Sequence, residues 1–299
     1  MLSILIPAYN FDVVDLADEL LRQSKSIDMP VEILIIDDHS LSYFRKRNAL
    51  LASRSKVSYL ELDYNIGRSK IRNRLVDFAS GEWLLFLDCD MVISRPDFLQ
   101  SYVSRLGEAP VICGGIGYGI RPMSQEYILR WKYGIVRESK PALRRQMFPH
   151  WSFLSGNFVI SREVYNQIRF NEDISGYGHE DTLFGLELKH RNIPVLHIDN
   201  QAIHIGLEPC YEYLAKSEQG IVNLIKLLRI APDMKPELQR AVRLLRVSRF
   251  MNFFRLNKPL SWVFMIFNPI IRRHLCSKRP SLILFDIYKL GLAARLFKG

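Results

Sequence analysis

The residues best suited to chemistry are two aspartates that follow a strongly apolar stretch. Asp88 and Asp90 come directly after residues 83–87, whose sequence is WLLFL. Carboxylates two residues apart at the end of a strand can share a divalent cation with a diphosphate, because oxygen ligands suit Mg²⁺ or Mn²⁺. A solvated turn is the alternative interpretation. The apolar strand favours the metal site, since charges beside a buried strand are costly unless something coordinates them.

A second acidic pair, Glu180 and Asp181, lies just before a helix predicted over residues 182–190. One interpretation is an N-terminal cap, which the helix dipole favours. The other is that one carboxylate acts as a general base and takes a proton from an acceptor hydroxyl. The nearby glycines, Gly176 and Gly178, would let backbone and substrate approach closely.

His204 is the third candidate, and it lies in the short apolar segment AIHIG. A histidine in such a segment can be a hydrogen-bonded core residue. It can also be a metal ligand, in which case it would complete the aspartate pair.

The elements that must position these residues are short apolar strands that alternate with amphipathic helices. The pattern predicts strands over residues 2–6, 31–36, 57–62, 83–87, 158–161 and 195–198, followed by a short apolar segment over 202–205, with helices over 13–23 and 69–79. Alternation of this kind implies βαβ units and a mostly parallel sheet, so the fold class is α/β. Ligands bind beyond the carboxyl ends of such strands, and the acidic side chains should therefore converge there.

Composition sets limits on the class of protein. With 299 residues, 48% of them hydrophobic, the chain can bury one large or two modest cores. No apolar run reaches the roughly 18 residues of a membrane span, and the N-terminus lacks the pattern of a signal peptide. Cys89, Cys113, Cys210 and Cys276 show no CxxC spacing. We therefore expect neither a zinc site nor a disulfide framework. We also expect the protein to reside in a reducing compartment.

The formal net charge of +10 is concentrated in the last part of the chain. Residues 235–299 contain 14 Lys and Arg but only two acidic residues, whereas residues 1–234 contain 27 basic and 29 acidic residues. Segments such as AVRLLRVSRFMNFFRL mix arginine with large apolar residues, which is typical of a helix lying on an anionic membrane. A helical bundle packed on the rest of the protein is the alternative. Nucleic-acid binding ranks last, because no recognised module accompanies the charge.

Seven fragments along residues 2–206 together resemble the family 2 glycosyltransferases, which have the GT-A fold. In chain order they are SILIPAYN, IIDDHS, NIGRSKIRN, LFLDCDM, SGNFVIS, GYGHED and AIHIG. The resemblance implies a Rossmann-like, mostly parallel sheet flanked by helices. It implies a catalytic domain over residues 1–207, with a nucleotide-binding half (1–109) and an acceptor-binding half (110–207). A basic amphipathic helical region (208–299) follows.

The resemblance also assigns residues to the nucleotide. Seven positions would border it: Pro7, Ala8, Tyr9, Asp38, Gly67, Arg68 and Arg72. Asp38 would accept a hydrogen bond from the base, typically uracil. Arg72 is the better arginine for the base or phosphates, and an exposed position on a helix is the alternative for both arginines.

The family pattern further implies a metal and a base. Asp90 would bind Mn²⁺ or Mg²⁺ directly, Asp88 would contact the ribose or the metal, and His204 would be a further ligand. Asp181 would be the catalytic base, with Glu180 holding hydroxyls of the donor sugar or acceptor. Asn157 belongs to the Ser-Gly-Asn turn that would border the donor sugar.

These assignments describe an inverting enzyme that moves a sugar from a UDP-sugar to a glycan or lipid-linked glycan, as in polysaccharide biosynthesis. It would be cytoplasmic or peripheral on the inner face of the cell membrane. One alternative is a nucleotidyltransferase, although the first loop, PAYNFD, has neither glycine nor lysine for phosphates. The other is a catalytically silent scaffold that binds nucleotide sugars at a membrane surface.

Overall fold

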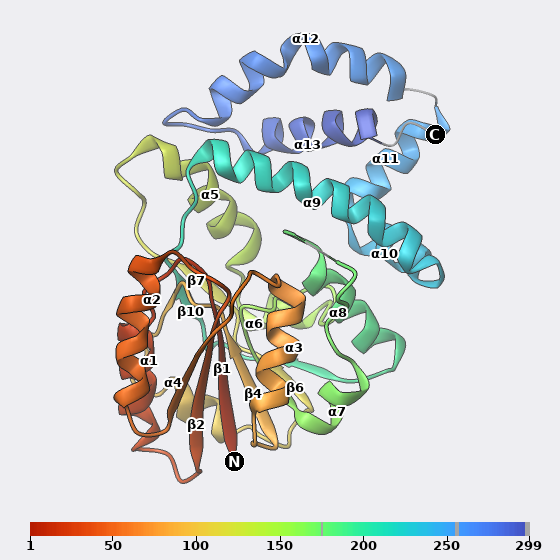
Figure 1. The fold of residues 1–299 in the computed structure, drawn as a ribbon. Helices are drawn as coiled ribbons and strands as arrows, with labels where there is room; N and C mark the ends of the chain where they lie inside the picture. Colours follow the sequence, from red (N-terminus) through yellow and green to blue (C-terminus); the bar gives the residue numbers. More distant parts are fainter. Residues whose placement is uncertain (175, 255–256, 297–299) are drawn as a thin grey trace. The chain divides into compact units, whose positions relative to one another are not determined.

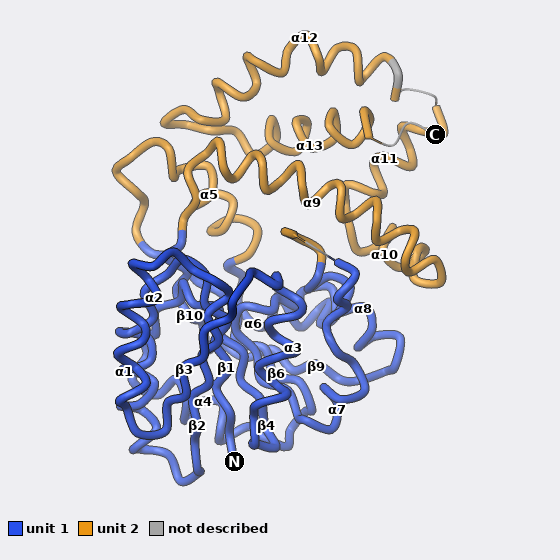
Figure 2. The backbone as a smooth tube through the Cα atoms, in the orientation of Figure 1, with its two compact units in different colours: residues 1–119, 139–175, 180–206 blue, residues 120–138, 176–179, 207–299 orange. Residues whose placement is uncertain are grey.

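The protein is described by a computed structural model that covers residues 1–174, 176–254 and 257–296, with Lys258 described by its backbone only. The chain divides into two compact units (Figure 2). Unit 1 comprises residues 1–119, 139–175 and 180–206, and unit 2 comprises residues 120–138, 176–179 and 207–299. Residues 120–138 thus group with the C-terminal region, which the sequence pattern does not indicate.

Unit 1 is built on a mixed sheet that is mostly parallel (Figure 1). In the described part of the chain seven strands pair in the order β3-β2-β1-β4-β8-β6-β9. They are β1 (Leu2–Ala8), β2 (Val31–Asp37), β3 (Val57–Glu61), β4 (Trp83–Leu87), β6 (Val111–Cys113), β8 (Asn157–Ser161) and β9 (Val195–His197). β8 runs antiparallel to both of its neighbours, and the other pairs are parallel. The α/β fold class is confirmed.

Apolar side chains on both faces of the central strands bury this sheet between helices. On one face Leu5 and Phe86 belong to a cluster that includes residues from α3 (Arg68–Phe78), α7 (Arg162–Gln167) and α8 (Glu180–His190). Figure 1 shows α1 (Val14–Ser24) on the opposite face, and α1 packs against α4 (Phe98–Val103). Burial on both sides explains why these strands are almost continuously apolar.

A small second sheet, which the sequence did not predict as such, brings distant segments of unit 1 together. It consists of β5 (Met91–Val92), β10 (Ala202–His204) and β7 (Ile116–Tyr118), with β10 in the middle. His204 pairs with Met91 in an antiparallel register. This pairing places His204 beside the turn that carries Asp90.

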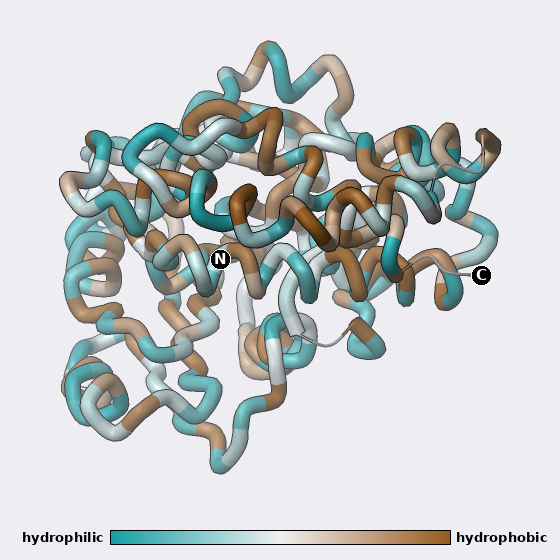
Figure 3. Tube along the Cα trace, turned by 90° about the horizontal axis from the view of Figure 1, so that it is seen from above, coloured by the Kyte–Doolittle hydropathy of each residue, from teal (hydrophilic) through white to brown (hydrophobic). Residues whose placement is uncertain are grey.

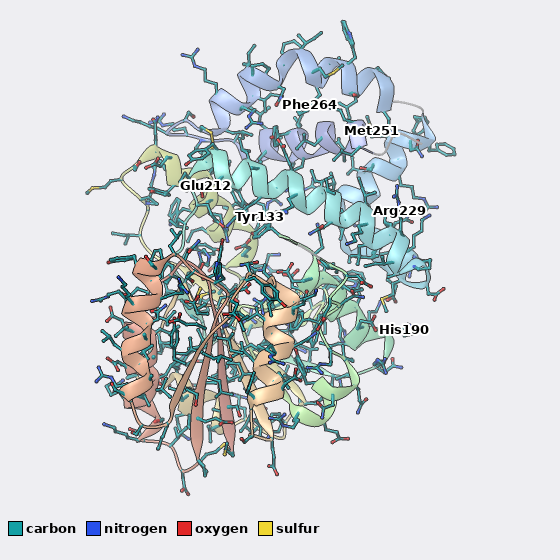
Figure 4. All side chains as sticks on the ribbon, viewed as in Figure 1. Tyr133, His190, Glu212, Arg229, Met251 and Phe264 are labelled. Carbon is teal, nitrogen blue, oxygen red and sulfur yellow. A yellow bond between two sulfur atoms is a disulfide. The ribbon has the colours of Figure 1, made fainter. Side chains whose placement is uncertain are left out.

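Unit 2 is helical and has its own hydrophobic core. Its helices are α5 (Ile128–Tyr133), a π-helical turn η3 (Gly134–Glu138), α9 (Cys210–Ile230), α10 (Lys235–Ala241), α11 (Arg243–Phe253), α12 (Asn257–Leu275) and α13 (Leu282–Leu296). Tyr133 of α5 packs its ring against Tyr213 of α9 and Phe285 of α13 (Figure 4). The buried Arg130 forms ion pairs with Glu138 and Glu208, which ties residues 120–138 to the C-terminal helices.

The shorter elements complete the description. They are α2 (Ser42–Asn48), α6 (Ala142–Gln146) and the 3₁₀ turns η1 (Ala49–Ser53), η2 (Gln125–Tyr127) and η4 (Pro232–Met234). Across the described ranges, no helix has both the length and the hydropathy that a membrane span requires.

The expectation that the cysteines form no disulfide is wrong for two of the four. Cys210 at the start of α9 and Cys276 just after α12 are joined by a disulfide, with their Cα atoms 5.4 Å apart. Cys89 and Cys113 are free. The two partners are 66 residues apart, so local spacing could not reveal the pair. The inference of a reducing compartment rested on the absence of disulfides and loses its support.

A buried histidine at the end of β9 gives unit 1 a testable pH dependence. Arg145 donates a hydrogen bond to Nδ1 of His197 at 2.6 Å, and Nε2 lies 2.9 Å from the carbonyl oxygen of Pro149, an arrangement that fits the neutral ring. Burial lowers the pKa of His197 from 6.5 to about 4. The unfolded state therefore takes up the proton first as the pH falls.

We predict that the free energy of unfolding is flat above pH 6.5 and falls between pH 6.5 and about 4, by about 3 kcal/mol from His197. The His197→Gln variant, which can still accept from Arg145 and donate to Pro149, should show a shallower slope in this window. Urea unfolding across this pH range measures the free energy of unfolding of the unchanged protein and of the variant. Equal slopes in the two proteins would contradict the assignment.

Candidate nucleotide and metal site

Asp38, just beyond the carboxyl end of β2, fixes the loop that leads into α3. Its backbone N–H donates to the carbonyl oxygen of Ala8, and its carboxylate accepts from the N–H groups of Ile66 at 2.7 Å and Gly67 at 3.0 Å. Burial raises the pKa of Asp38, although these two N–H groups oppose the rise. Gly67 has φ of 85°, a conformation that favours glycine, and it caps α3. Asp38 thus positions the helix that carries both predicted arginines.

Two of the three arginines of α3, Arg68 and Arg72, lie among carboxylates from two other segments. Arg72 is buried and donates to Asp88 at 2.5 Å, and its guanidinium also lies over the ring of Phe170. Arg68, which is partly exposed, donates to Glu180 at 2.5 Å and lies 3.7 Å from Asp88. The alternative of two exposed helix positions is therefore wrong for Arg72. Two cations and two anions alternate through this cluster.

These charges keep the two carboxylates ionised despite their burial. Burial opposes ionisation of Asp88, but the charges of Arg72 and Arg68 outweigh it and hold the pKa of Asp88 below its ordinary value. Glu180 behaves in the same way, with burial opposed by Arg68 and then Arg72, so its pKa is also lowered. A carboxylate that stays charged at neutral pH is suited to binding cations and hydroxyls rather than to donating a proton.

Asp90 and His204 meet at the edge of the small sheet. Nε2 of His204 lies 3.1 Å from Oδ2 of Asp90, so two of the three predicted metal ligands are adjacent. Asp88 is instead directed to Arg72. Within the ranges that the structure describes, no three or more His, Cys, Asp and Glu side chains form a group that could hold a metal ion.

The chemistry of this pair nevertheless fits a divalent cation. Oδ1 of Asp90 is buried and has no hydrogen-bond partner among the described residues, and the same is true of Nδ1 of His204 and Oε2 of Glu180. Buried polar atoms are normally satisfied, and an unsatisfied carboxylate oxygen beside an imidazole indicates a missing ion or water. We infer that Asp90 and His204 are suited to hold Mg²⁺ or Mn²⁺.

Asp181 follows Glu180 in the first turn of α8. Its Oδ1 accepts a hydrogen bond from the N–H of Thr182 at 2.7 Å, one of the first-turn N–H groups that have no partner within a helix. Its side chain is only partly buried, whereas Glu180 is buried. Capping and proton abstraction are compatible roles for a carboxylate with four lone-pair sites.

Asn157 is placed differently from the sequence expectation of a donor contact. It is buried, its Oδ1 accepts from the Tyr102 hydroxyl, and its Nδ2 donates to the carbonyl oxygens of Gly115 and Asn200. All of these partners belong to the scaffold of unit 1. The side chain therefore joins β8 to neighbouring loops.

The nucleotide-binding positions predicted in the first loop lie at the end of β1. Ala8 is buried, Pro7 is partly buried, and Tyr9 is 52% exposed. Because Ala8 pairs with Asp37 at the end of β2, this loop and Asp38 lie at the same edge of the sheet. Of these three residues, Tyr9 has an exposed aromatic ring that could stack on a ligand.

Two glycines outside the predicted site residues also shape the site. A Cβ atom at Gly206 would lie 2.3 Å from Oδ2 of Asp90, and one at Gly156 would lie 2.9 Å from Oδ2 of Asp88. Any larger residue at position 156 or 206 would clash with these carboxylates. The only signal was their place in the fragments AIHIG and SGNFVIS.

Comparison with known proteins decides the family. Residues 3–169, more than half of the chain, match the family model described as Glycosyl transferase family 2. The chain belongs to this family. The family 2 chain is 26% identical over 276 residues to validoxylamine A glucosyltransferase from Streptomyces hygroscopicus subsp. limoneus, which covers 81% of this chain and 59% of that protein. It spans about three fifths of the length of the curated relatives it matches.

Three solved structures show the same GT-A fold. A mannosyltransferase from Pyrobaculum calidifontis in complex with GDP-Man and Mn²⁺ is 15% identical, with a TM-score of 0.55 over 99% of this chain and 81% of that one. TarS from S. aureus in complex with UDP is 16% identical, with a TM-score of 0.52 over 99% and 91%. Glucosyl-3-phosphoglycerate synthase from Mycobacterium tuberculosis with Mg²⁺ and UDP is 20% identical, with a TM-score of 0.53 over 76% and 78%.

The different burial of the two arginines leads to a prediction about stability. Arg72→Leu leaves Asp88 without its closest partner inside the protein and should cost about 3 kcal/mol. Arg68→Leu removes a side chain that is 40% exposed, and Arg72 still supports the buried Glu180 carboxylate, so this variant should cost less, about 1–2 kcal/mol. Urea unfolding at neutral pH measures both variants, and a larger loss for Arg68→Leu would contradict the arrangement described.

Proposed function

We propose that this family 2 chain is a metal-dependent, inverting glycosyltransferase that uses a UDP-sugar donor. The observation that carries the proposal is the unsatisfied Asp90 carboxylate beside His204, next to the arginine–carboxylate cluster of α3, β4 and α8. A diphosphate needs both positive charge and a coordinated cation, and these residues provide for both.

The arginines supply the positive charge for the donor. Arg68 and Arg72 are balanced by Asp88 and Glu180 in the cluster. A diphosphate would compete with these carboxylates for the guanidinium groups, and Asp88 would then turn toward the ribose or the cation. Asp38 keeps lone pairs available for a uracil N–H while it holds the loop. Solved relatives hold UDP in some cases and GDP-Man in another, so the uracil assignment rests on Asp38.

The metal role belongs to Asp90 and His204. When bound, Mn²⁺ or Mg²⁺ would neutralise charge that develops on the departing nucleoside diphosphate. Asp90 contributes a carboxylate oxygen that has no competing donor, and His204 contributes an imidazole nitrogen at 3.1 Å from the same side chain. Gly206 leaves the space that this pair occupies.

Asp181 is proposed as the base and Glu180 as the residue that holds sugar hydroxyls. Asp181 would take the proton from the acceptor hydroxyl while that oxygen attacks the anomeric carbon from the side opposite the diphosphate. A single displacement of this kind inverts the anomeric configuration. Arg68 holds one carboxylate oxygen of Glu180. The other oxygen, Oε2, has no partner among the described residues, so it can accept a hydrogen bond from a sugar hydroxyl.

The acceptor is proposed to be a glycan or a lipid-linked glycan, with the enzyme at the cytoplasmic side of a membrane. The nucleotidyltransferase alternative gains no support, because the family membership and the first loop both disfavour it. The silent scaffold remains the contrasting hypothesis, and turnover distinguishes it from the enzyme.

The direct test combines ligand binding with turnover in matched variants. We expect UDP with Mn²⁺ to raise the melting temperature of the protein more than UDP alone. Asp90→Asn should remove the Mn²⁺-dependent part of this rise. Asp181→Asn should keep the rise but lower sugar transfer about 10²- to 10⁴-fold, the usual contribution of a general base. Release of UDP from UDP-sugars measures turnover.

Asp97→Asn is the control, because Asp97 is exposed and bonds only to Arg95 and Ser101 in the described structure. It should leave both binding and turnover unchanged. A silent scaffold would show the UDP–Mn²⁺ shift but no UDP release from any donor. Full activity in Asp90→Asn would contradict the metal assignment.

A further inference from the structure

The α12 helix of unit 2 has one face in the core. Its buried residues Ser261, Phe264, Ile271 and Leu275 fall on a single side of the helix. Phe264 lies on the side of α12 toward α13, where it packs against Tyr288 (Figure 4). The Cys210–Cys276 disulfide ties the end of α12 to α9. The orientation of α12 within unit 2 is therefore fixed.

The remaining arc of α12 is also apolar, but within the described structure nothing covers it. Six large apolar side chains between positions 262 and 270 are 44–66% exposed: Trp262, Val263, Met265, Ile266, Phe267 and Ile270. An amphipathic helix of a globular protein normally presents polar residues on this side. Figure 3 shows the backbone from above, with brown hydrophobic and teal hydrophilic residues alternating along the helical tubes.

Neighbouring segments also expose large apolar side chains. Phe250 and Phe253 of α11, with Phe254 after it, are 53–81% exposed. Ile283 near the start of α13 is 73% exposed. Clustered apolar side chains such as the six on α12 mark an interaction site, since single exposed apolar residues are common but clusters are not.

Basic side chains accompany the apolar ones, and acidic ones are few. The exposed basic residues of these segments are Arg243, Arg246, Arg249, Arg273, Lys278 and Arg279. Asp286, one of only two acidic residues after position 234, is paired with Arg137 and Lys289 and lies 3.9 Å from Arg243. Apolar side chains combined with an excess of positive charge complement a surface that is apolar beneath a layer of negative charge. An anionic lipid bilayer has this structure.

We propose that unit 2 docks on an anionic membrane through α11 and α12. The outer arc of α12, a helix of 19 residues and about 28 Å in length, lies in the membrane plane with its apolar side chains among the headgroups. The arginines of α11 contact lipid phosphates. This binding does not depend on the proposed transferase activity, and it would bring the enzyme to an acceptor carried on a lipid.

A membrane fits better than a protein partner or a nucleic acid. The cores of protein interfaces are depleted in charged residues, whereas arginines and apolar residues are interleaved along α11. Nucleic acids would use the arginines but would leave the apolar arc of α12 in water. Only a bilayer satisfies both features at once.

Co-sedimentation of the full chain with lipid vesicles tests the proposal. We expect binding to phosphatidylcholine vesicles that contain about one third phosphatidylglycerol, and little binding to phosphatidylcholine alone. The combined Arg243→Gln, Arg246→Gln and Arg249→Gln variant should bind about 100-fold more weakly, at about fivefold per residue. These arginines lie outside the buried core, so the variant should fold, which circular dichroism checks.

Two further variants complete the experiment. Arg22→Gln, at an exposed arginine of α1 in unit 1, is the control and should bind like the unchanged protein. Trp262→Ser combined with Ile270→Ser should weaken binding even at low salt. Equal binding to both kinds of vesicle, or none to the anionic ones, would overturn the proposal. A dimer in solution that Trp262→Ser dissociates would also overturn it, because the surface would then join two copies.

Discussion

Charge balance between α3 and the acidic residues that surround it is the interaction on which the site depends. The buried Arg72 pairs with Asp88, and the partly exposed Arg68 pairs with the buried Glu180, so each buried charge has a partner of opposite sign. Asp38 holds the start of α3 through two backbone N–H groups. One carboxylate therefore sets the position of both arginines, and both arginines keep two further carboxylates charged.

Asp90 does not pair with these arginines, and this difference suits it to bind a cation. Its nearest partner is His204, and one of its oxygens is buried without a donor among the described residues. The small sheet creates this situation, because β10 pairs with β5 and brings residue 204 to residue 90. If Asp90 served stability alone, we would expect a hydrogen-bond donor beside its buried Oδ1 atom. The missing partner is best explained by a ligand that binds during function.

The strand ends could be predicted from sequence, whereas the partners of the side chains could not. The apolar run WLLFL becomes β4 with the predicted bounds, and the helix predicted over residues 69–79 becomes α3 at Arg68–Phe78. Local periodicity fixes such elements. The ion pair of Arg68 with Glu180 joins residues 112 apart, and the Cys210–Cys276 disulfide joins residues 66 apart. Only tertiary structure reveals them. Asn157 shows the same limit, since its motif predicted a ligand contact and its buried hydrogen bonds serve the scaffold.

The measurement closest to the central claim is anomalous X-ray diffraction at the manganese edge from crystals grown with UDP and Mn²⁺. We predict a manganese peak in contact with the Asp90 carboxylate and the UDP diphosphate, with Asp88 released from Arg72. A manganese peak elsewhere, or UDP bound while Asp90 remains paired with His204 alone, would contradict the account.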